Sequence, residues 1–191
     1  MNTIIFATNN EHKLYEVKKM LNAEINLVSL SDVNITEDIP EDQNTLEGNA
    51  EQKADYIFTK LSSNVFADDT GLEIEALNGE PGVYSARYAG SGKDASANMK
   101  KVLQNLNGVV NRKAQFRTSI CLILNGDKYF FEGVVKGIIL ESASGKMGFG
   151  YDPIFQPDGY NCSFAEMELS EKNKISHRGQ AVKKLINFLN S

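Results

Sequence analysis

Two adjacent carboxylates, Asp68 and Asp69, stand between runs of strand-like residues in the segment FADDTGLEIEALNG, residues 66–79. Neighbouring carboxylates repel each other, and burying either one is unfavourable without a compensating cation or hydrogen bonds. If both follow a buried strand, their side chains point in opposite directions from the backbone. One could then bind a metal ion while the other holds a basic side chain. A surface turn is the alternative, because Asp-Thr-Gly is favourable turn chemistry.

Mg²⁺ suits such a pair, because it takes one or two protein carboxylates and keeps water and substrate phosphates as its other ligands. Further carboxylates occur in an acidic loop and on the helix that follows it. The loop candidates are Glu37, Asp38, Glu41 and Asp42, and the helix candidates are Glu47, Glu51 and Asp55. Lys53 and Lys60 lie near the helical carboxylates, which favours a solvated helix face for Glu51 and Asp55.

The segment ATNNEHK, residues 7–13, is a strand that runs into a helix through a polar turn. Free backbone N–H groups and the helix dipole favour an anion at such a position, and Lys13 would add a positive charge. A plain capped helix with a solvated lysine is the alternative. The segment is not a Walker A loop, because the pattern G-x-x-x-x-G-K-[ST] occurs nowhere in the chain.

The segment GFGYDPIF, residues 148–155, places Phe149 and Tyr151 in a glycine-framed loop with Asp152 beside them. Such a loop can present aromatic faces to a base, with backbone N–H groups nearby. An aromatic turn of the core would have the same composition. The loop is therefore a candidate base-binding site on composition alone.

The segment KNKISHRGQ places Lys172, Lys174, His177 and Arg178 just before a C-terminal helix. A nucleophilic triad is not indicated, because no G-x-S-x-G motif and no Cys–His pairing is visible. The spacing of zinc ligands is also missing. The segment fits a cluster of donors for an anion or a carbonyl group, and a solvated helix start is the alternative.

The composition of the 191 residues indicates an ordinary globular protein of one domain, or of one domain with two lobes. A net charge of −5 argues against a nucleic-acid groove, because phosphate backbones require a basic face. Cys121 lies in an apolar run, and two cysteines form no disulfide framework, which fits a reducing cytosol. We expect no signal peptide and no membrane-spanning segment.

The expected elements are strands and helices in mixed order. Strands are predicted at residues 3–8, 25–30, 64–69, 72–77, 114–124 and 128–140, the last two joined by a hairpin turn at Asn125-Gly126. Helices are predicted after Asn9 or Asn10, after Thr45, after Asp94 and at the C-terminus. Because helices alternate with strands and the hairpin is antiparallel, we predict an α/β fold with a mixed sheet flanked by helices.

Taken together, these segments resemble the inosine triphosphate pyrophosphatase family, which hydrolyses non-standard purine nucleoside triphosphates. The resemblance rests on ATNNEHK, ADDTGLEIEALNGEPGVYSARYAG, GFGYDPIF and SHRGQA, in matching order over nearly the whole chain. It implies a single elongated domain over residues 1–191, with two lobes around a central cleft, that works as a homodimer. It also implies Mg²⁺-dependent hydrolysis of ITP, dITP and XTP to the monophosphate and pyrophosphate.

The resemblance also assigns roles to individual residues. The implied triphosphate-binding residues are Thr8, Asn9, Asn10 and Lys13. Asp69 is the implied catalytic carboxylate, and Glu41 is its implied partner in binding the metal. The residues implied at the substrate or its base are Thr70, Phe149, Gly150, Tyr151, Asp152, Lys172, His177 and Arg178.

Two positions depart from the family pattern. Asn9 stands where glycine is usual, and Gly48 stands where an acidic residue is usual in the helix opening TLEGNA. Two other functions stay open at this point. One is hydrolysis of modified pyrimidine triphosphates, as in the related Maf-like enzymes, and the other is nucleotide sensing without turnover.

Overall fold

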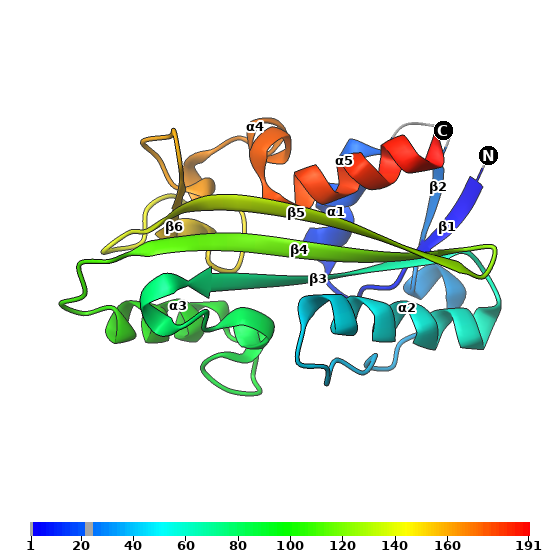
Figure 1. Ribbon diagram of the computed structural model, residues 1–191, viewed down its shortest axis with the longest axis horizontal. Helices are drawn as coiled ribbons and strands as arrows, with labels where there is room; N and C mark the ends of the chain where they lie inside the picture. Colours follow the sequence, from blue (N-terminus) through cyan, green and yellow to red (C-terminus); the bar gives the residue numbers. More distant parts are fainter. Residues whose placement is uncertain (1, 22–24) are drawn as a thin grey trace. The chain divides into compact units, whose positions relative to one another are not determined.

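The computed structural model describes residues 2–21 and 25–191, which form one six-stranded sheet with helices packed against it (Figure 1). The strands are β1 (Asn2–Phe6), β2 (Ile25–Ser29), β3 (Val65–Ile74), β4 (Lys113–Leu124), β5 (Asp127–Ile139) and β6 (Phe155–Pro157). The helices are α1 (Glu11–Met20), α2 (Leu46–Leu61), α3 (Ala95–Asn105), α4 (Leu169–Ile175) and α5 (His177–Leu189). No helix in these two ranges is both long enough and apolar enough to cross a membrane.

The sheet is mixed, as the sequence predicts. Its strand order is β2-β1-β3-β4-β5-β6, in which β1 pairs in parallel with β2 and β3, and β5 pairs antiparallel with β6. Asn125 and Gly126 form the two-residue turn between β4 and β5, with φ angles of 54° and 94°. Positive φ at both turn residues matches the twist of a hairpin, so the predicted Asn-Gly turn is confirmed.

Three predicted helix caps are confirmed. The side chain of Asn10 accepts a hydrogen bond from the backbone N–H of Lys13, and that of Thr45 accepts one from the N–H of Gly48. The carboxylate of Asp94 accepts two from the first turn of α3. Each cap satisfies an N–H group that has no partner inside the helix, which fixes where α1, α2 and α3 begin.

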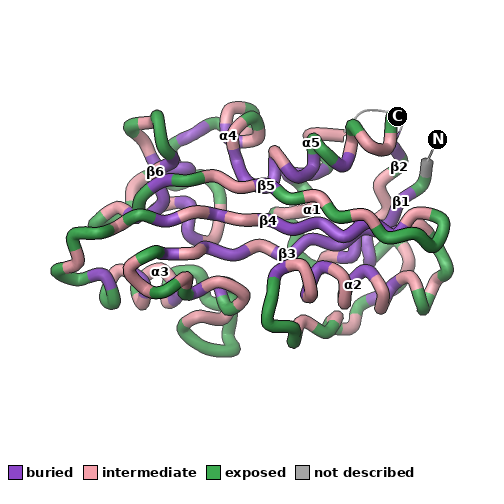
Figure 2. The backbone as a smooth tube through the Cα atoms, in the orientation of Figure 1, coloured by how far each residue is buried: buried purple, intermediate pink, exposed green. Residues whose placement is uncertain are grey.

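The chain divides into two compact units. The first unit comprises residues 1–69, 118–133 and 178–191, and the second comprises residues 70–117 and 134–177. Strands β3, β4 and β5 each contribute residues to both units. Figure 2 shows that β3 is buried along most of its length, and its ten residues are all buried or half-buried.

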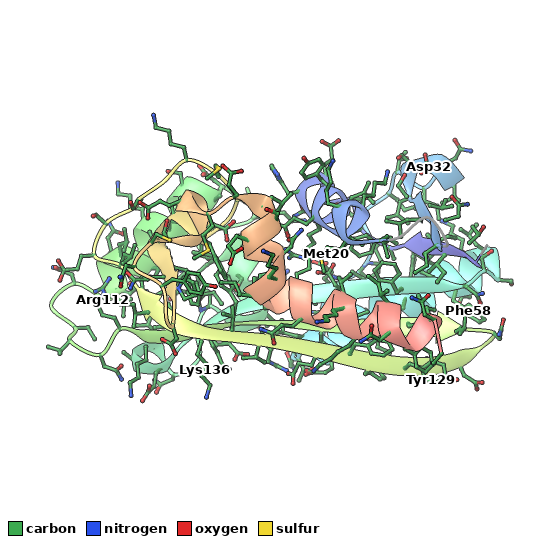
Figure 3. All side chains as sticks on the ribbon, turned by 90° about the horizontal axis from the view of Figure 1, so that it is seen from above. Met20, Asp32, Phe58, Arg112, Tyr129 and Lys136 are labelled. Atoms are coloured by element: carbon green, nitrogen blue, oxygen red, sulfur yellow. The ribbon has the colours of Figure 1, made fainter. Side chains whose placement is uncertain are left out.

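The core of the first unit lies on both faces of its strands. Val65 and Ala67 of β3 belong to the cluster that α2 covers, whereas Phe66 belongs to the cluster that α1 and α5 cover (Figure 1). The ring of Tyr129 on β5 packs against Phe188 of α5, with 4.4 Å between ring centroids (Figure 3). Successive β3 residues thus face opposite layers of helices, as the period of a strand requires.

The core of the second unit is rich in aromatic rings. Phe116 of β4 packs edge-on against Phe155 of β6, with 4.7 Å between centroids, and lies 6.2 Å from Phe164. Val102 of α3 and Leu106, which follows the helix, complete the same buried cluster. Arg112 ties the end of β4 to β5 and to the segment after it, because its guanidinium donates to the carbonyl oxygens of Leu106, Ile139 and Leu140.

The structure corrects one prediction about β3. Two strands, at residues 64–69 and 72–77, were expected on either side of the Asp pair, which would have stood at a strand end. Instead β3 runs unbroken from Val65 to Ile74, and the pair lies in its middle. The surface turn is excluded for the same reason. The strand can continue through two carboxylates because each has cationic or polar partners on its own face, as described next.

Candidate active site

Alternation along β3 sends the two carboxylates to opposite faces of the sheet. Asp68 has the parity of Phe66, and its Oδ2 lies 3.0 Å from the ammonium of Lys13 on α1. Asp69 has the parity of Ala67, and its Oδ2 accepts a hydrogen bond of 2.9 Å from Asn49 on α2. The prediction that the pair points in opposite directions is confirmed, and each carboxylate has its own set of partners.

Asp68 is the centre of a buried charge cluster. Besides Lys13, the Nε of Arg178 lies 3.6 Å from the same Asp68 oxygen, and Nη1 of Arg178 is ion-paired with Glu16 of α1. Asp68, Glu16 and Arg178 each expose 5% or less of their side chains. Burial alone would raise the pKa of Asp68, but the charges of Lys13 and Arg178 outweigh it and hold the pKa at about 2. Asp68 therefore stays ionised at neutral pH.

The turn before α1 presents polar groups next to this cluster. Thr8 accepts a hydrogen bond from the N–H of Asn10 through its hydroxyl, and Asn10 caps the helix. The amide of Asn9 donates to the backbone oxygen of Glu37 in the acidic loop. Burial lowers the pKa of Lys13, and Asp68 opposes that shift. The predicted triphosphate-binding turn thus begins a helix whose first turn carries Lys13 toward Asp68.

On the other face, Asp69 and Glu41 share one cation. The ammonium of Lys53 on α2 lies 2.5 Å from Oε1 of Glu41 and 3.7 Å from Oδ1 of Asp69. Asn49 and Lys53 are four residues apart on α2, so both side chains project from one face of the helix toward β3. The backbone N–H of Gln43 donates to the amide oxygen of Asn49, which ties the acidic loop to the same helix face.

The electrostatics of this second cluster follow from its burial. Lys53 is 4% exposed, and burial opposes its charge, but Asp69 and Glu41 together raise its pKa. Burial raises the pKa of Asp69, and the charge of Lys53 opposes that shift. Lys53 lies closer to Glu41 than to Asp69, so its stabilising effect on the Asp69 carboxylate is incomplete.

These two carboxylates fit a hard divalent cation. They already converge on one cation, and oxygen ligands from one or two carboxylates are what Mg²⁺ takes from a protein. Among residues 2–21 and 25–191 there is no cluster of three or more His, Cys, Asp or Glu side chains that would form an all-protein cage. Two carboxylates alone would leave the other positions of a Mg²⁺ ion to water and substrate phosphates, which is how proteins usually bind this ion.

Three of the other carboxylates that the sequence offered as ligands form ion pairs elsewhere. Glu37 is ion-paired with Lys60. Glu51 and Asp55 each lie 2.7 Å from the ammonium of Lys128 on β5. These last two side chains are more than 40% exposed, so the prediction of a solvated helix face is confirmed for them.

The second unit holds a buried ion pair among aromatic rings. Lys172 of α4 lies 2.7 Å from Oδ2 of Asp152, and the same oxygen accepts a hydrogen bond from the backbone N–H of Phe149. The ammonium also lies 5.1 Å from the centroid of the Phe149 ring. A Cβ atom at Gly148 would lie 2.2 Å from the Asp152 carboxylate, so only glycine lets the loop approach this closely. Asp152 thus fixes both the loop and Lys172.

Two further predicted base-binding residues, Tyr151 and His177, are held by contacts within the second unit. The His177 ring stacks on Phe116, with centroids 4.6 Å apart and planes 18° apart. The hydroxyl of Tyr151 donates to the backbone oxygen of Ser85. Thr70 continues β3 directly after Asp69 and is half-buried. Gly150 and Thr70 belong to this unit too, whereas Arg178, the next residue after His177, belongs to the first.

The match to a known protein family covers the part of the chain that contains these site residues. Residues 4–188 match the model of the Ham1 family. The chain belongs to the Ham1 family. This confirms the resemblance to the inosine triphosphate pyrophosphatase family on which the site assignments rest. The match leaves only three residues at each end of the chain outside it.

Several relatives cover nearly the full length of this Ham1-family chain. The dITP/XTP pyrophosphatase of Flavobacterium johnsoniae is 53% identical over 186 residues, which are 97% of either chain. That of Flavobacterium psychrophilum is 52% identical over 185 residues, again 97% of either chain. The Ham1 protein structure from Coxiella burnetii matches with a TM-score of 0.91 at 37% identity, covering 100% of this chain and 99% of that one. The Staphylococcus aureus Ham1 structure gives a TM-score of 0.90 at 37% identity, with 99% and 98% covered.

Sequence reasoning missed three buried polar side chains of this Ham1-family site, namely Glu16, Asn49 and Lys53. Asn49 and Lys53 lie on the side of α2 that also carries Ala50, Ala54 and other core residues, where a polar side chain is unexpected. A polar residue on the apolar face of an amphipathic helix was the available signal. In the sequence, Lys53 was interpreted only as a neighbour of Glu51 and Asp55 on a solvated helix face.

The departure at Gly48 also has a structural explanation. A Cβ atom at position 48 would lie 2.9 Å from Cβ of Gln43, because the acidic loop packs directly on the first turn of α2. That loop carries Glu41, and Gln43 anchors it through Asn49. The missing side chain at position 48 therefore gives the loop room to reach the helix.

Proposed function

We propose that this Ham1-family chain hydrolyses non-standard purine nucleoside triphosphates, namely dITP, ITP and XTP, to the monophosphate and pyrophosphate, with Mg²⁺ as cofactor. The chain is a hydrolase of triphosphate anhydride bonds, as its relatives' name, dITP/XTP pyrophosphatase, states for them. The observation that carries the proposal is the pair of carboxylates, Glu41 and Asp69, that converge on one cation. Removal of deaminated purines from the nucleotide pool is the corresponding role.

In the first unit, the proposed roles are electrostatic. Water must attack the α-phosphorus while pyrophosphate leaves, and such transfers depend on positioning and on neutralising the charge of the phosphates. When bound by Glu41 and Asp69, Mg²⁺ would supply Lewis-acid stabilisation of phosphate oxygens. Lys13 would bind the phosphates from the first turn of α1, together with the polar groups of Thr8, Asn9 and Asn10. Asp69 would orient the attacking water.

In the second unit, the proposed roles concern the base. Phe149 and Tyr151 offer rings on which a purine can stack, and Lys172 and His177 offer donors. Hypoxanthine and xanthine carry an acceptor at the 6-position, where adenine carries a donor. A donor that meets a carbonyl makes a hydrogen bond, whereas one that meets an amino group is left buried and unpaired. A site with such donors therefore favours deaminated purines over ATP and dATP.

One experiment tests the proposal directly. The purified protein is incubated with dITP, XTP, ITP, dATP and a modified pyrimidine triphosphate, with Mg²⁺ or with a chelator, and pyrophosphate is resolved from orthophosphate. We expect pyrophosphate release from the deaminated purines, dependent on Mg²⁺. Preferred turnover of the pyrimidine would favour the Maf-like alternative, and tight binding of dITP with no product would favour a nucleotide sensor.

The partners implied by the family are part of the same proposal. We propose that two copies of the chain form a homodimer, that the protein works in the cytoplasm, and that it binds no nucleic acid. Light scattering at several concentrations tests the dimer, and a monomeric mass throughout would contradict it. The net charge of −5 supports the exclusion of nucleic acid.

A further inference from the structure

Lys53 is a cation built into the protein at the carboxylates that would bind Mg²⁺. Its ammonium lies within 3.7 Å of both Glu41 and Asp69, and its side chain is 5% exposed. It projects from the middle of α2, whose buried face packs in the core of the first unit. A lysine held in this way cannot move far from the pair without losing both contacts.

We propose that the positive charge of Lys53 weakens the binding of a free divalent cation to Glu41 and Asp69, so that the cation binds well only together with the triphosphate. This inference rests on the proposed function, because it takes Glu41 and Asp69 as the metal ligands. On this proposal, the charge of Lys53 determines whether the metal can bind before the nucleotide does.

The first argument is electrostatic. A divalent cation on the oxygens of Glu41 and Asp69 would lie a few ångströms from the Lys53 ammonium, and like charges in a buried site repel strongly. A nucleoside triphosphate brings several negative charges, which compensate the ammonium and the metal together. The metal–nucleotide complex therefore meets less repulsion than the free ion.

The second argument concerns what holds the carboxylates in place. If Lys53 alone positioned them, its removal would weaken metal binding by disordering the site. However, Asp69 is also held by Asn49, and the acidic loop is anchored by the bond from Gln43 to Asn49. A further bond from Gln52 reaches Asp42 in that loop. Since these contacts do not involve Lys53, the loss of repulsion should outweigh the loss of order.

The test is the binding of Mn²⁺, as a paramagnetic probe for Mg²⁺, to the full chain without nucleotide. Electron paramagnetic resonance of free Mn²⁺ gives the Kd for wild type, for Lys53→Met and for the control Lys101→Met. Met keeps the length of the side chain and removes its charge. We expect Lys53→Met to bind Mn²⁺ about tenfold more tightly or better, because a like charge at contact distance is lost. Lys101→Met, which removes a half-buried lysine whose ammonium donates to the backbone oxygen of Tyr88 in the second unit, should stay within about threefold of wild type.

A second variant guards against misfolding. If circular dichroism shows that Lys53→Met is not folded, Lys53→Gln replaces it, because the neutral amide can still donate to Glu41. Adding Glu41→Gln to either neutral variant should abolish the gain, which locates the ion on the pair. Unchanged or weaker Mn²⁺ binding in the folded neutral variant would overturn the inference. Because no nucleotide is present, this result is independent of whether the chain hydrolyses dITP.

Discussion

Buried charges are arranged differently in the two units. In the first unit, Asp68 and Asp69 each face more than one polar partner, and Lys13 and Lys53 approach them from separate helices. In the second unit, Asp152 and Lys172 form a compact pair enclosed by aromatic rings. In the proposed function, the first arrangement would bind phosphates and a metal ion, whose charge changes during the reaction, and the second would form a fixed frame for a neutral base.

The largest expected effect comes from Asp69→Asn in the first unit. The introduced amide has the same shape as the carboxylate and can still form a hydrogen bond with Asn49. However, it lacks the negative charge that attracts a cation. We expect dITP turnover to fall on the order of 10⁴-fold, as for other single catalytic residues, while the thermal unfolding curve stays cooperative. Near-normal turnover by a folded variant would show that Asp69 is not needed for hydrolysis. The electrostatic role proposed for the first unit would then be wrong.

Breaking the ion pair of the second unit should instead affect stability. Lys172→Met leaves the Asp152 carboxylate buried without its ammonium partner, which costs about 3–5 kcal/mol of unfolding free energy. The double variant Lys172→Met/Asp152→Asn removes both charges and should recover part of that loss. Denaturant unfolding gives the free energy of unfolding of wild type, of both single variants, Lys172→Met and Asp152→Asn, and of the double variant. Additive effects in this cycle would show that the two charges do not stabilise each other. That result would contradict the structural role of this ion pair in the second unit.

Lys13→Ala tests whether the first unit recognises phosphates regardless of the base. Loss of one charge-assisted hydrogen bond should lower kcat/KM by the equivalent of about 1.5–3 kcal/mol. The same factor is expected for dITP and for dATP, because both carry the same triphosphate. Steady-state kinetics with the two substrates provide the comparison, and a marked difference between the two factors would argue that Lys13 contacts the base.

The pH dependence of stability should report Asp68. Its pKa is about 2 in the folded protein and 3.8 in the reference state, so its ionised form stabilises the fold above pH 4, and this contribution is lost as the pH falls toward 2. The shift corresponds to about 2 kcal/mol. The stability difference between wild type and Asp68→Asn should therefore shrink by about that amount between pH 5 and pH 2. A difference that stays constant over this range would mean that Asp68 is not held by Lys13 and Arg178.

The smallest expected effect concerns Arg178. The family resemblance assigns it to the base, but in the structure it is ion-paired with Glu16 and Asp68. If it reads the base, Arg178→Ala should lose dITP activity and narrow the preference for dITP over dATP by about tenfold. Measuring kcat/KM for dITP and dATP in wild type and in Arg178→Ala shows whether Arg178 reads the base. A preserved ratio with reduced turnover would place Arg178 functionally with the charge cluster of the first unit.

Local chemistry made much of this molecule predictable from sequence. Asn10, Thr45 and Asp94 cap the helices as expected because a cap depends only on residues within one turn. The Asn125-Gly126 turn follows from its own dihedral preferences. The opposite directions of Asp68 and Asp69 follow from the period of any strand.

The rest depends on partners far apart in the chain. The continuity of β3 could not be predicted, because the groups that make its carboxylates tolerable come from α1, α2 and α5. Glu16 and Arg178 are separated by 162 positions, and Asp152 and Lys172 by 20. Lys53 looked like a surface residue because its partner Glu41 lies in a loop without regular structure. The apolar face of α2 signals that Lys53 is buried, but the partners in all these pairings are fixed by tertiary packing and no local pattern identifies them.

The placement of two unlike sites on consecutive residues of one strand also limits how this protein can evolve. Substitution at Asp68 or Asp69 changes one face of the sheet and leaves the other residue in position. Insertion or deletion of a single residue earlier in β3 would exchange the two faces, directing Asp69 toward α1 and the residue after it toward α2. Homologous chains can therefore vary in length before and after β3, but the strand itself must keep its residue count up to Asp69.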